Sequence, residues 1–363
     1  MAIAVLAAAG TVAASARAAE PAEGADWQLT LRSERHSDAL PLSALGSDNW
    51  QQLAPRRGSN LALLEDELRL SRSRAGWTAS LLLRQQATLV ASDSALALAA
   101  RVDGGRKPAT DSSWQADVRL RAFAGAGLAL GHGQVLAGGW SWRGEAQLLA
   151  LGRWRERRLA GPVSFSAASG VYSFDLRSDE TDDRLETPFQ QAFTRRGTGL
   201  LLASELAWEG SSAWVSAGLR DGGWLHWRGV PQQQALLNTA TQAVDADGYL
   251  IYKPLVRGQN RQDGFTRWLP WRASLSAGAR LPGGDRLGLR LDTLADFGVL
   301  PALLWQRPAA QPGNLALGAE WRLHERRLDL LLDWQGLTLR AGADRLSGQA
   351  RSQHLAVGWT RRF

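Results

Sequence analysis

Arginines and carboxylates recur at every second position along several segments, and these side chains are the best suited to chemistry. In the segment 114–122, Asp117, Arg119 and Arg121 follow one another at a spacing of two. A guanidinium group stays charged and binds carboxylate or phosphate oxygens through two donors, and rings of charged side chains select ions in pores. The residues of this kind are Arg84, Asp117, Arg119, Arg121, Arg272, Arg280, Arg290, Asp292, Glu320, Arg322, Asp329, Asp333, Arg340 and Asp344. Eight arginines against six acids predict at most a weak preference for anions.

The other reactive side chains form no recognisable catalytic or metal motif. The five histidines are scattered, and no two of them have the spacing of metal ligands. An acidic cluster in 179–186 lacks the central glycine and the final glutamate of a calcium-binding loop, so a solvated loop is the simpler interpretation. We therefore expect no cofactor, no metal and no enzymatic activity, with an outer-membrane hydrolase as a remote alternative.

The elements that position these charges are β-strands. Apolar residues alternate with polar ones along 77–84, 114–122, 271–281, 286–293 and 315–323, whereas a helix would need apolar residues at spacings of three and four. Glycine-containing breaks such as 281–285 and 335–336 separate the segments and are typical of hairpin turns. The pattern predicts a long antiparallel meander.

Three features favour a transmembrane barrel, with apolar residues facing lipid and charges facing the lumen. The alternating segments are about 8–11 residues long, which suits a tilted membrane strand. Full charges occupy the polar face, and tryptophans lie near segment ends, where an interfacial girdle is expected. The predicted girdle residues are Trp77, Trp114, Trp271, Trp321, Trp334 and Trp359. We predict a single all-β domain over residues 19–363 that forms a barrel of about 16 strands. Any strand number from roughly 14 to 18 is compatible with the pattern.

The two ends of the chain point to the bacterial envelope. Residues 1–18 contain a short apolar stretch that ends in small residues, and they resemble a secretory signal peptide. The last strand, HLAVGWTRRF, ends on Phe363 and resembles the terminal strand of bacterial outer-membrane β-barrels. This resemblance implies a porin-like class and location in the outer membrane. It also implies contact with lipid and lipopolysaccharide, and recognition of Phe363 by the barrel-assembly machinery.

Composition agrees with an exported barrel. The 363 residues carry a formal charge of +7, contain no cysteine and include 17 tryptophans. The absence of cysteine excludes a disulfide scaffold and a cysteine-based zinc site. Basic residues alternate with apolar ones instead of forming a patch, so we expect no nucleic-acid binding.

The long loops and the contents of the lumen distinguish the possible functions of the barrel. The alternation breaks near 36–62, 178–197 and 229–264, which we interpret as long loops; the first contains a helical turn and 231–244 has helical character. The third loop either folds inward and constricts a pore, or forms an external cap or a disordered loop. The first hypothesis is a porin-like channel for small hydrophilic or anionic solutes, or for an extended polymer. The alternative is a closed barrel that acts as a structural or partner-binding component of an envelope complex, and Leu82 and Leu331 on the inward face fit a partly filled lumen.

Overall fold

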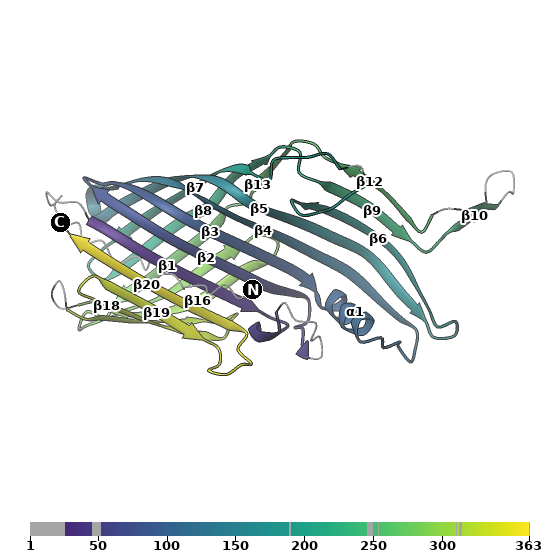
Figure 1. Cartoon of the computed structure of the whole chain (residues 1–363). Helices are drawn as coiled ribbons and strands as arrows, with labels where there is room; N and C mark the ends of the chain where they lie inside the picture. Colours follow the sequence, from purple (N-terminus) through teal and green to yellow (C-terminus); the bar gives the residue numbers. More distant parts are fainter. Residues whose placement is uncertain are drawn as a thin grey trace.

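Fourteen strands hydrogen-bond side by side and close into an antiparallel β-barrel (Figure 1). The structure is a computed structural model that describes residues 26–362 except 46–51, 189, 245–249, 253, 310 and 312–313. In ring order the barrel strands are β1 (Asp26–Ser37), β2 (Ser59–Arg74), β3 (Trp77–Ser92), β4 (Ser112–Val135), β5 (Trp140–Ser166), β7 (Gly197–Glu209), β8 (Ala213–Trp227), β14 (Arg272–Arg280), β15 (Arg286–Leu294), β16 (Gly298–Arg307), β17 (Ala316–Arg322), β18 (Arg327–Trp334), β19 (Leu337–Ala343) and β20 (Ser352–Arg362). Pairing of β20 with β1, as at Trp359 and Leu29, closes the ring.

Four outer strands extend this sheet beyond the ring. They are β6 (Val171–Asp182), β9 (Gln232–Asn238), β12 (Val256–Arg261) and β13 (Phe265–Leu269). The first half of β5 pairs with β7 inside the ring, whereas its second half pairs with β6, which in turn pairs with β9. We call β6, β9, β12 and the halves of β4 and β5 beside them the projecting sheet, because they extend well past the other strands in Figure 1.

Short elements complete the described chain. Helix α1 (Asp93–Asp103) follows β3 and is capped by the Ser92 hydroxyl, which accepts from the N–H of Ala95. Two 3-10 turns, η1 (Leu42–Ala44) and η3 (Ala137–Gly139), lie in connections, and β10 (Gln242–Val244) pairs with β11 (Leu250–Tyr252) as a separate hairpin. In the described residues, no helix has both the length and the apolar character needed to cross a membrane.

The two ends of the barrel differ. Asp26 and Arg362 lie at one end, which we call the turn end, together with tight connections such as 75–76 and 335–336. Both residues of each of these turns have positive φ, as two-residue hairpins that match the strand twist require. The longer connections 38–58, 93–111, 183–196 and 344–351 lie at the opposite end, the loop end, from which the projecting sheet also extends.

Side chains alternate between the outer face and the lumen, as predicted. On β3, Leu81 and Leu83 are 57% and 55% exposed, whereas Leu82 and Arg84 between them are 3% and 4% exposed. Leucines on most other barrel strands are also exposed on the outer face, and charged side chains are buried inside. A soluble barrel would have the reverse pattern, with its apolar residues inside.

Several details differ from the expectations. The barrel has 14 strands, at the lower end of the expected range. The first two loops are shorter than expected, because β1 runs to Ser37 and β6 runs to Asp182. The prediction of helical character over 231–244 was wrong: β9 and β10 lie there, since the free edge of β6 offers hydrogen-bond partners that override a weak helical preference. The helical turn in the first loop is η1, whereas residues 1–18 and Phe363 lie outside the described residues.

Candidate functional site

Glu65 of β2 lies at the centre of a charge network that crosses the lumen. Its carboxylate oxygens lie 2.9 Å from Arg272 Nη1, 3.4 Å from Arg32 Nη1, 3.4 Å from Arg220 Nη1 and 3.9 Å from Arg84 Nη2. Arg272 belongs to β14, which is the sixth strand after β2 in the ring of 14. This strand therefore lies nearly opposite β2. The Glu65–Arg272 ion pair therefore joins the two walls of the barrel directly.

A β-bulge in β8 supplies two consecutive charges to this network. The register between β7 and β8 shifts between Leu202 and Ser204, and Asp221 adopts a φ of 65°. The extra residue turns both Arg220 and Asp221 inward. Asp221 is buried and its Oδ1 lies 2.7 Å from Arg84 Nη2, so β8 and β3 are also tied across the lumen.

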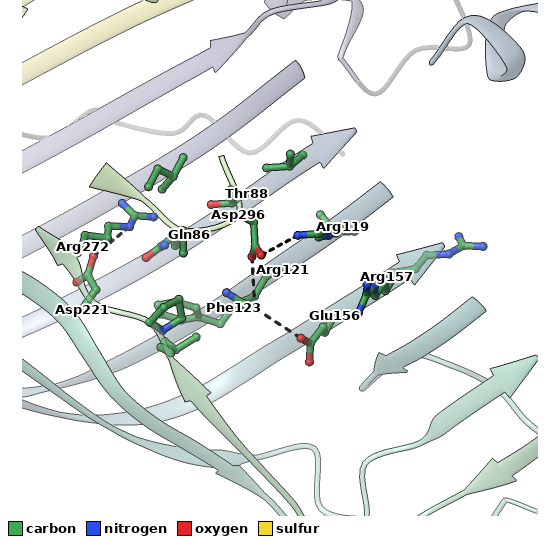
Figure 2. Close-up of a pocket in the computed structure, with 17 residues that line it drawn as sticks. Gln86, Thr88, Arg119, Arg121, Phe123, Glu156, Arg157, Asp221, Arg272 and Asp296 are labelled. Atoms are coloured by element: carbon green, nitrogen blue, oxygen red, sulfur yellow. Dashed lines mark hydrogen bonds and ion pairs between the residues drawn. The ribbon is translucent and has the colours of Figure 1, made fainter. Parts of the chain in front are cut away.

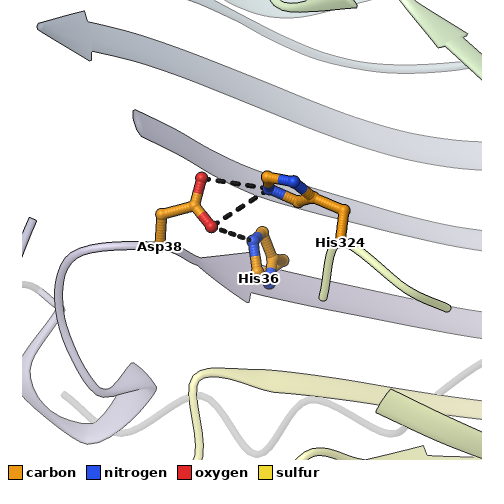
Figure 3. A group of neighbouring side chains, drawn as sticks. All are labelled: His36, Asp38 and His324. Carbon is orange, nitrogen blue, oxygen red and sulfur yellow. Dashed lines mark hydrogen bonds and ion pairs between the residues drawn. The ribbon is translucent and has the colours of Figure 1, made fainter. Parts of the chain in front are cut away.

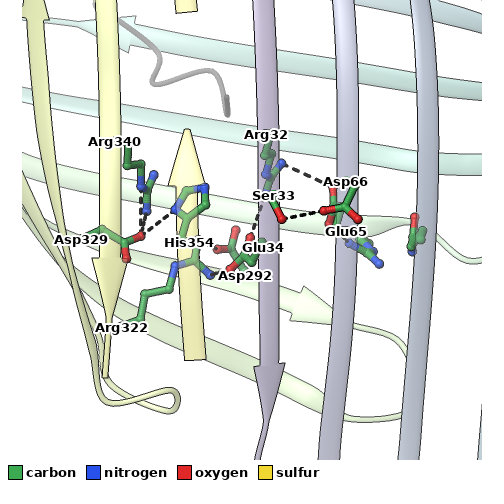
Figure 4. Close-up of polar contacts among 12 residues, drawn as sticks. Arg32, Ser33, Glu34, Glu65, Asp66, Asp292, Arg322, Asp329, Arg340 and His354 are labelled. Atoms are coloured by element: carbon green, nitrogen blue, oxygen red, sulfur yellow. Dashed lines mark hydrogen bonds and ion pairs between the residues drawn. The ribbon is translucent and has the colours of Figure 1, made fainter. Parts of the chain in front are cut away.

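Asp329 of β18 is the centre of the other half of the network (Figure 4). Its carboxylate accepts hydrogen bonds from Arg327 Nε at 2.7 Å and from Arg340 Nη2 at 2.6 Å, and His354 Nδ1 lies 3.0 Å away. Asp329 and Arg327 are completely buried. Arg327 also donates to Glu34 of β1 at 2.8 Å, which links this half to the β1–β2 wall.

The complete network is nearly neutral. Its described members are Arg32, Arg84, Arg220, Arg272, Arg290, Arg322, Arg327 and Arg340 with Glu34, Glu65, Asp221, Asp292, Glu320, Glu325 and Asp329. Eight arginines minus seven acids leave one positive charge. Buried ions are costly unless they are paired and hydrogen-bonded, and here each carboxylate has at least one guanidinium partner. The arrangement neutralises the interior and leaves little net charge to attract a solute.

An apolar cluster fills the lumen beside the network. Leu82, Phe123, Trp154, Leu201 and Trp227 belong to one group of buried residues contributed by β3, β4, β5, β7 and β8. Trp154 is completely buried, and its ring centroid lies 5.6 Å from that of Phe265 on β13. Most side chains of the network and all of this cluster are buried, whereas Arg220 and Arg290 keep 35% and 26% of their side-chain surface exposed.

The structure brings together about half of the charged residues that we predicted to line the lumen. Arg84, Arg272, Arg290, Asp292, Glu320, Arg322, Asp329 and Arg340 belong to the network. Asp117, Arg119 and Arg121 lie together at the loop end, and Arg280 pairs with Glu209 at the turn end. Asp333 is half-buried on β18, and Asp344 accepts from the backbone N–H groups of Arg351 and Ser352 in a loop.

Sequence reasoning missed much of the centre of the network. Glu34 is in phase with Gln28, Thr30 and Arg32, which alternate with apolar residues in 27–31, and Glu65 is in phase with Glu67 and Arg69, which alternate with Leu68 and Leu70. Extending the same period of two would therefore have placed both on the inward face. Asp221 gave no such signal, because the bulge reverses the face assignment within β8.

The predicted girdle tryptophans occupy four different places. Trp77, Trp334 and Trp359 are about half exposed on the outer face at the turn end, and Trp321 is similarly exposed near the loop end. Trp271 is half-buried and packs over Gly222, where any side chain would collide with its ring. Trp114 lies in the projecting sheet, 6.3 Å from the ring of Tyr172 and under the guanidinium of Arg101. Exposed Trp27, Trp140, Trp224 and Trp268 were missed.

The basic run 153–158 and the acidic run 179–183 pair with each other. They lie on adjacent strands, β5 and β6, where Arg153 contacts both Asp182 and Asp183. Arg157 lies 3.6 Å from Glu180 in the same ladder. The carboxylates of 179–183 are therefore paired with arginines within the described residues, and residues 153–158 belong to β5.

His36, Asp38 and His324 meet at the loop end although they are far apart in the sequence (Figure 3). Their potential ligand atoms lie within 4.8 Å of one another, so these residues could hold a metal ion. However, Arg56 Nη1 lies 2.9 Å from Asp38 Oδ1 and already supplies a positive charge there. Burial raises the pKa of the Asp38 carboxyl, but hydrogen bonds with His324, His36 and the N–H of Leu61 lower it by a larger amount. The pKa of Asp38 therefore lies well below its usual range.

Comparison with known proteins adds no relative: no protein-family model and no curated protein sequence matches the chain. The barrel, its lumen and its outer surface are therefore the guides to function.

Proposed function

We propose that the chain is a sealed outer-membrane β-barrel that acts as a structural or partner-binding component of the envelope. What supports a membrane location is the outer face: leucines such as Leu81, Leu289 and Leu330 are 44–60% exposed there. Tryptophans lie toward both ends of this apolar band, as at membrane–water interfaces. An exposed apolar surface of this extent is not stable in water.

The single observation that best supports a sealed lumen is the set of ion pairs between opposite walls of the barrel. Glu65 binds Arg272 and Arg220 across the barrel, and Glu65, Asp221 and Arg272 are all buried. Solute passage would require these pairs to separate while the charges remain in the interior, which is costly. A near-neutral interior in which each carboxylate of the network has a guanidinium partner suits a filled barrel better than a selective pore.

The projecting sheet is where a partner would bind. Within the described residues, residue-by-residue pairing joins β12 to β9 alone, and all six residues of β12 are exposed. A strand edge of this kind can accept a further strand from another chain.

A channel is the second candidate, and one observation favours it. A cavity of about 230 Å³ with several arginines lies at the loop end, directly beyond Asp221 and Arg272 of the network. If the ion pairs part in response to a ligand or a partner, this cavity becomes the vestibule of a pore.

The membrane location can be tested with single spin labels, because the chain contains no cysteine. Leu330→Cys places a label on the outer face of β18, and Arg257→Cys places the control label on β12. After reconstitution into liposomes, we expect oxygen to relax the first label and a water-soluble nickel complex to relax the second. Strong relaxation of the Leu330→Cys label by the nickel complex would contradict a membrane location.

A further inference from the structure

The cavity at the loop end has a charged wall and an apolar wall (Figure 2). Its volume is about 230 Å³. Arg119 and Arg121 of β4 and Arg158 of β5 belong to the charged wall, and Phe123 and Leu294 to the apolar wall. Arg272 and Asp221 close the inner end, so the cavity is separated from the turn end by the charge network.

Donors of this cavity remain unused within the described residues. Arg121 approaches Glu156 at 3.7 Å and Asp296 at 3.9 Å, which is too long for hydrogen bonds, and its Nε is buried without a partner. Arg272 Nη2 is also buried without a partner, on a side chain that is only 7% exposed. Unpaired buried donors are costly, so the Nε of Arg121 calls for an acceptor. For Arg272 an unpartnered acceptor, Asp221 Oδ2, already lies 3.6 Å from Nε.

Like charges also face each other in the cavity. Arg119 and Arg158 are directly opposite in the pairing of β4 with β5, and Arg121 is the diagonal neighbour of Arg158. Opposed like charges destabilise a sheet unless a counter-charge lies between them. Two acids, Asp117 and Asp296, hydrogen-bond Arg119, but no described acid forms an ion pair with Arg158. Of the five lining arginines, three have an acidic partner within 3.6 Å, whereas Arg121 has only longer contacts and Arg158 has no ion pair among the described residues, so positive charge is left at these two.

We propose that this cavity binds an oxyanion group carried on a compact organic molecule, such as the carboxylate of an acidic sugar. Arg121 and Arg158 would bind the oxyanion, because guanidinium groups match carboxylate and phosphate oxygens with two parallel donors. Phe123 and Leu294 would contact the carbon skeleton. The volume is below the roughly 300 Å³ at which pockets for drug-sized ligands begin, which limits the ligand to about one sugar ring. The proposal stands whether or not the lumen is sealed.

The test is calorimetric titration of the detergent-solubilised full chain with four probes. These are D-glucuronate, glucose 1-phosphate, inorganic phosphate and neutral glucose. We expect saturable binding of glucuronate or glucose 1-phosphate, and the tighter of the two identifies the oxyanion. Glucose should bind at least ten-fold more weakly, since it lacks the charge. Binding of inorganic phosphate alone would contradict the role of the apolar wall, and binding of none of the acidic probes would overturn the proposal.

Variants then assign the site. Arg121→Gln and Arg158→Gln should each weaken binding by at least ten-fold, whereas Arg177→Gln, which removes an exposed arginine from β6, should leave it unchanged. Ala295→Trp fills the cavity without removing a charge and should abolish binding, so the site can be tested even if an arginine variant does not fold. Retention of heat-modifiable migration on gels confirms folding in each case. Unchanged affinity in Arg121→Gln and Ala295→Trp would place binding elsewhere and overturn the proposal.

Discussion

At the scale of single residues, Glu65 is the carboxylate with the most arginine partners in the buried network. Glu65→Gln would leave Arg32, Arg84, Arg220 and Arg272 around a neutral side chain. We expect the free energy of unfolding to fall by about 3–5 kcal/mol, the usual cost of removing one partner from a buried ion pair. The measurement is urea unfolding in detergent micelles, followed by tryptophan fluorescence.

Glu67→Gln is the matched control for this prediction. Glu67 lies two positions along β2 and is 21% exposed, and its partner Arg69 keeps a second carboxylate, Glu145. We expect a loss of about 1 kcal/mol or less for this partly exposed pair. Equal destabilisation by the two substitutions would show that the network centred on Glu65 contributes no more to stability than a partly exposed ion pair.

Asp38 predicts a specific response to pH. Its folded-state pKa lies well below that of an unfolded aspartate, about 3.9. A carboxyl of this kind contributes stability above the unfolded pKa, and the contribution is lost as the pH falls towards the folded pKa. The stability difference between the native chain and Asp38→Asn should therefore shrink by about 1 kcal/mol between pH 7 and pH 3. Urea unfolding of both proteins at pH 7, 5 and 3 measures it, and a difference that is constant or grows on acidification would refute the assignment.

Individual contacts were harder to predict than individual faces. Alternation correctly placed Arg84 and Asp329 inside, because their strands keep a strict period of two. It could not place Asp221, since a bulge changes the face of one residue without changing the composition around it. It could not bring His36 to His324 either, because that contact depends on ring closure and on the loop that carries Arg56.

At the scale of elements, the two faces of β15 should respond in opposite ways to substitution. Leu289 is 44% exposed on the outer face, and the neighbouring Arg290 points inward and pairs with Asp292. Leu289→Arg should cost about 2–4 kcal/mol if its site lies near the midplane of the membrane. Arg290→Leu should fold nearly normally, because Asp292 keeps Arg322 as a partner.

Assembly into liposomes, followed by heat-modifiable migration, compares these two variants directly. The expected result is poor insertion of Leu289→Arg and near-native insertion of Arg290→Leu. Equal tolerance of both substitutions would remove the argument that the outer face contacts lipid.

The outer edge of the projecting sheet, β9 and β12, should be separable from the ring. Gln232 and Arg261 are directly paired, so residues 233–260 can be replaced by a two-residue Asn-Gly turn. This deletion removes β12 and most of β9 but leaves the ring pairings, such as those of β5 with β7, unchanged. We expect a folded, heat-modifiable barrel with thermal stability close to that of the full chain. Failure to fold would show that the outer strands hold the ring together.

Strand positions followed from periodicity more reliably than loop contents did. The segments 77–84, 286–293 and 315–323 lie in strands as predicted, because each needs one apolar face over its whole length. The segment 231–244 is polar and has a weak pattern, so its structure depends on the free edge of β6. That edge is a property of the assembled sheet and is invisible in a short window of sequence.

At the scale of the whole molecule, the class of fold was predictable and the number of barrel strands only approximately so. The expectation of about 16 strands assumes strands of similar length that all belong to the ring, but β4 and β5 have 24 and 27 residues and four strands lie outside the ring. The sealing of the lumen was less predictable still. It depends on Glu65 meeting Arg272 across the ring, and that contact follows only from the order and tilt of all the strands.

Planar-bilayer conductance of the folded, heat-modifiable protein tests the central claim, that side chains seal the lumen, most directly. The cross-lumen pairs of Glu65 with Arg272 and of Asp221 with Arg84 predict an insertion without stable conductance steps at moderate voltage. Reproducible steps of large and uniform size from the native chain would contradict the sealed lumen. That result would favour the channel, with the sign of its reversal potential in a salt gradient reporting the charge of the pore.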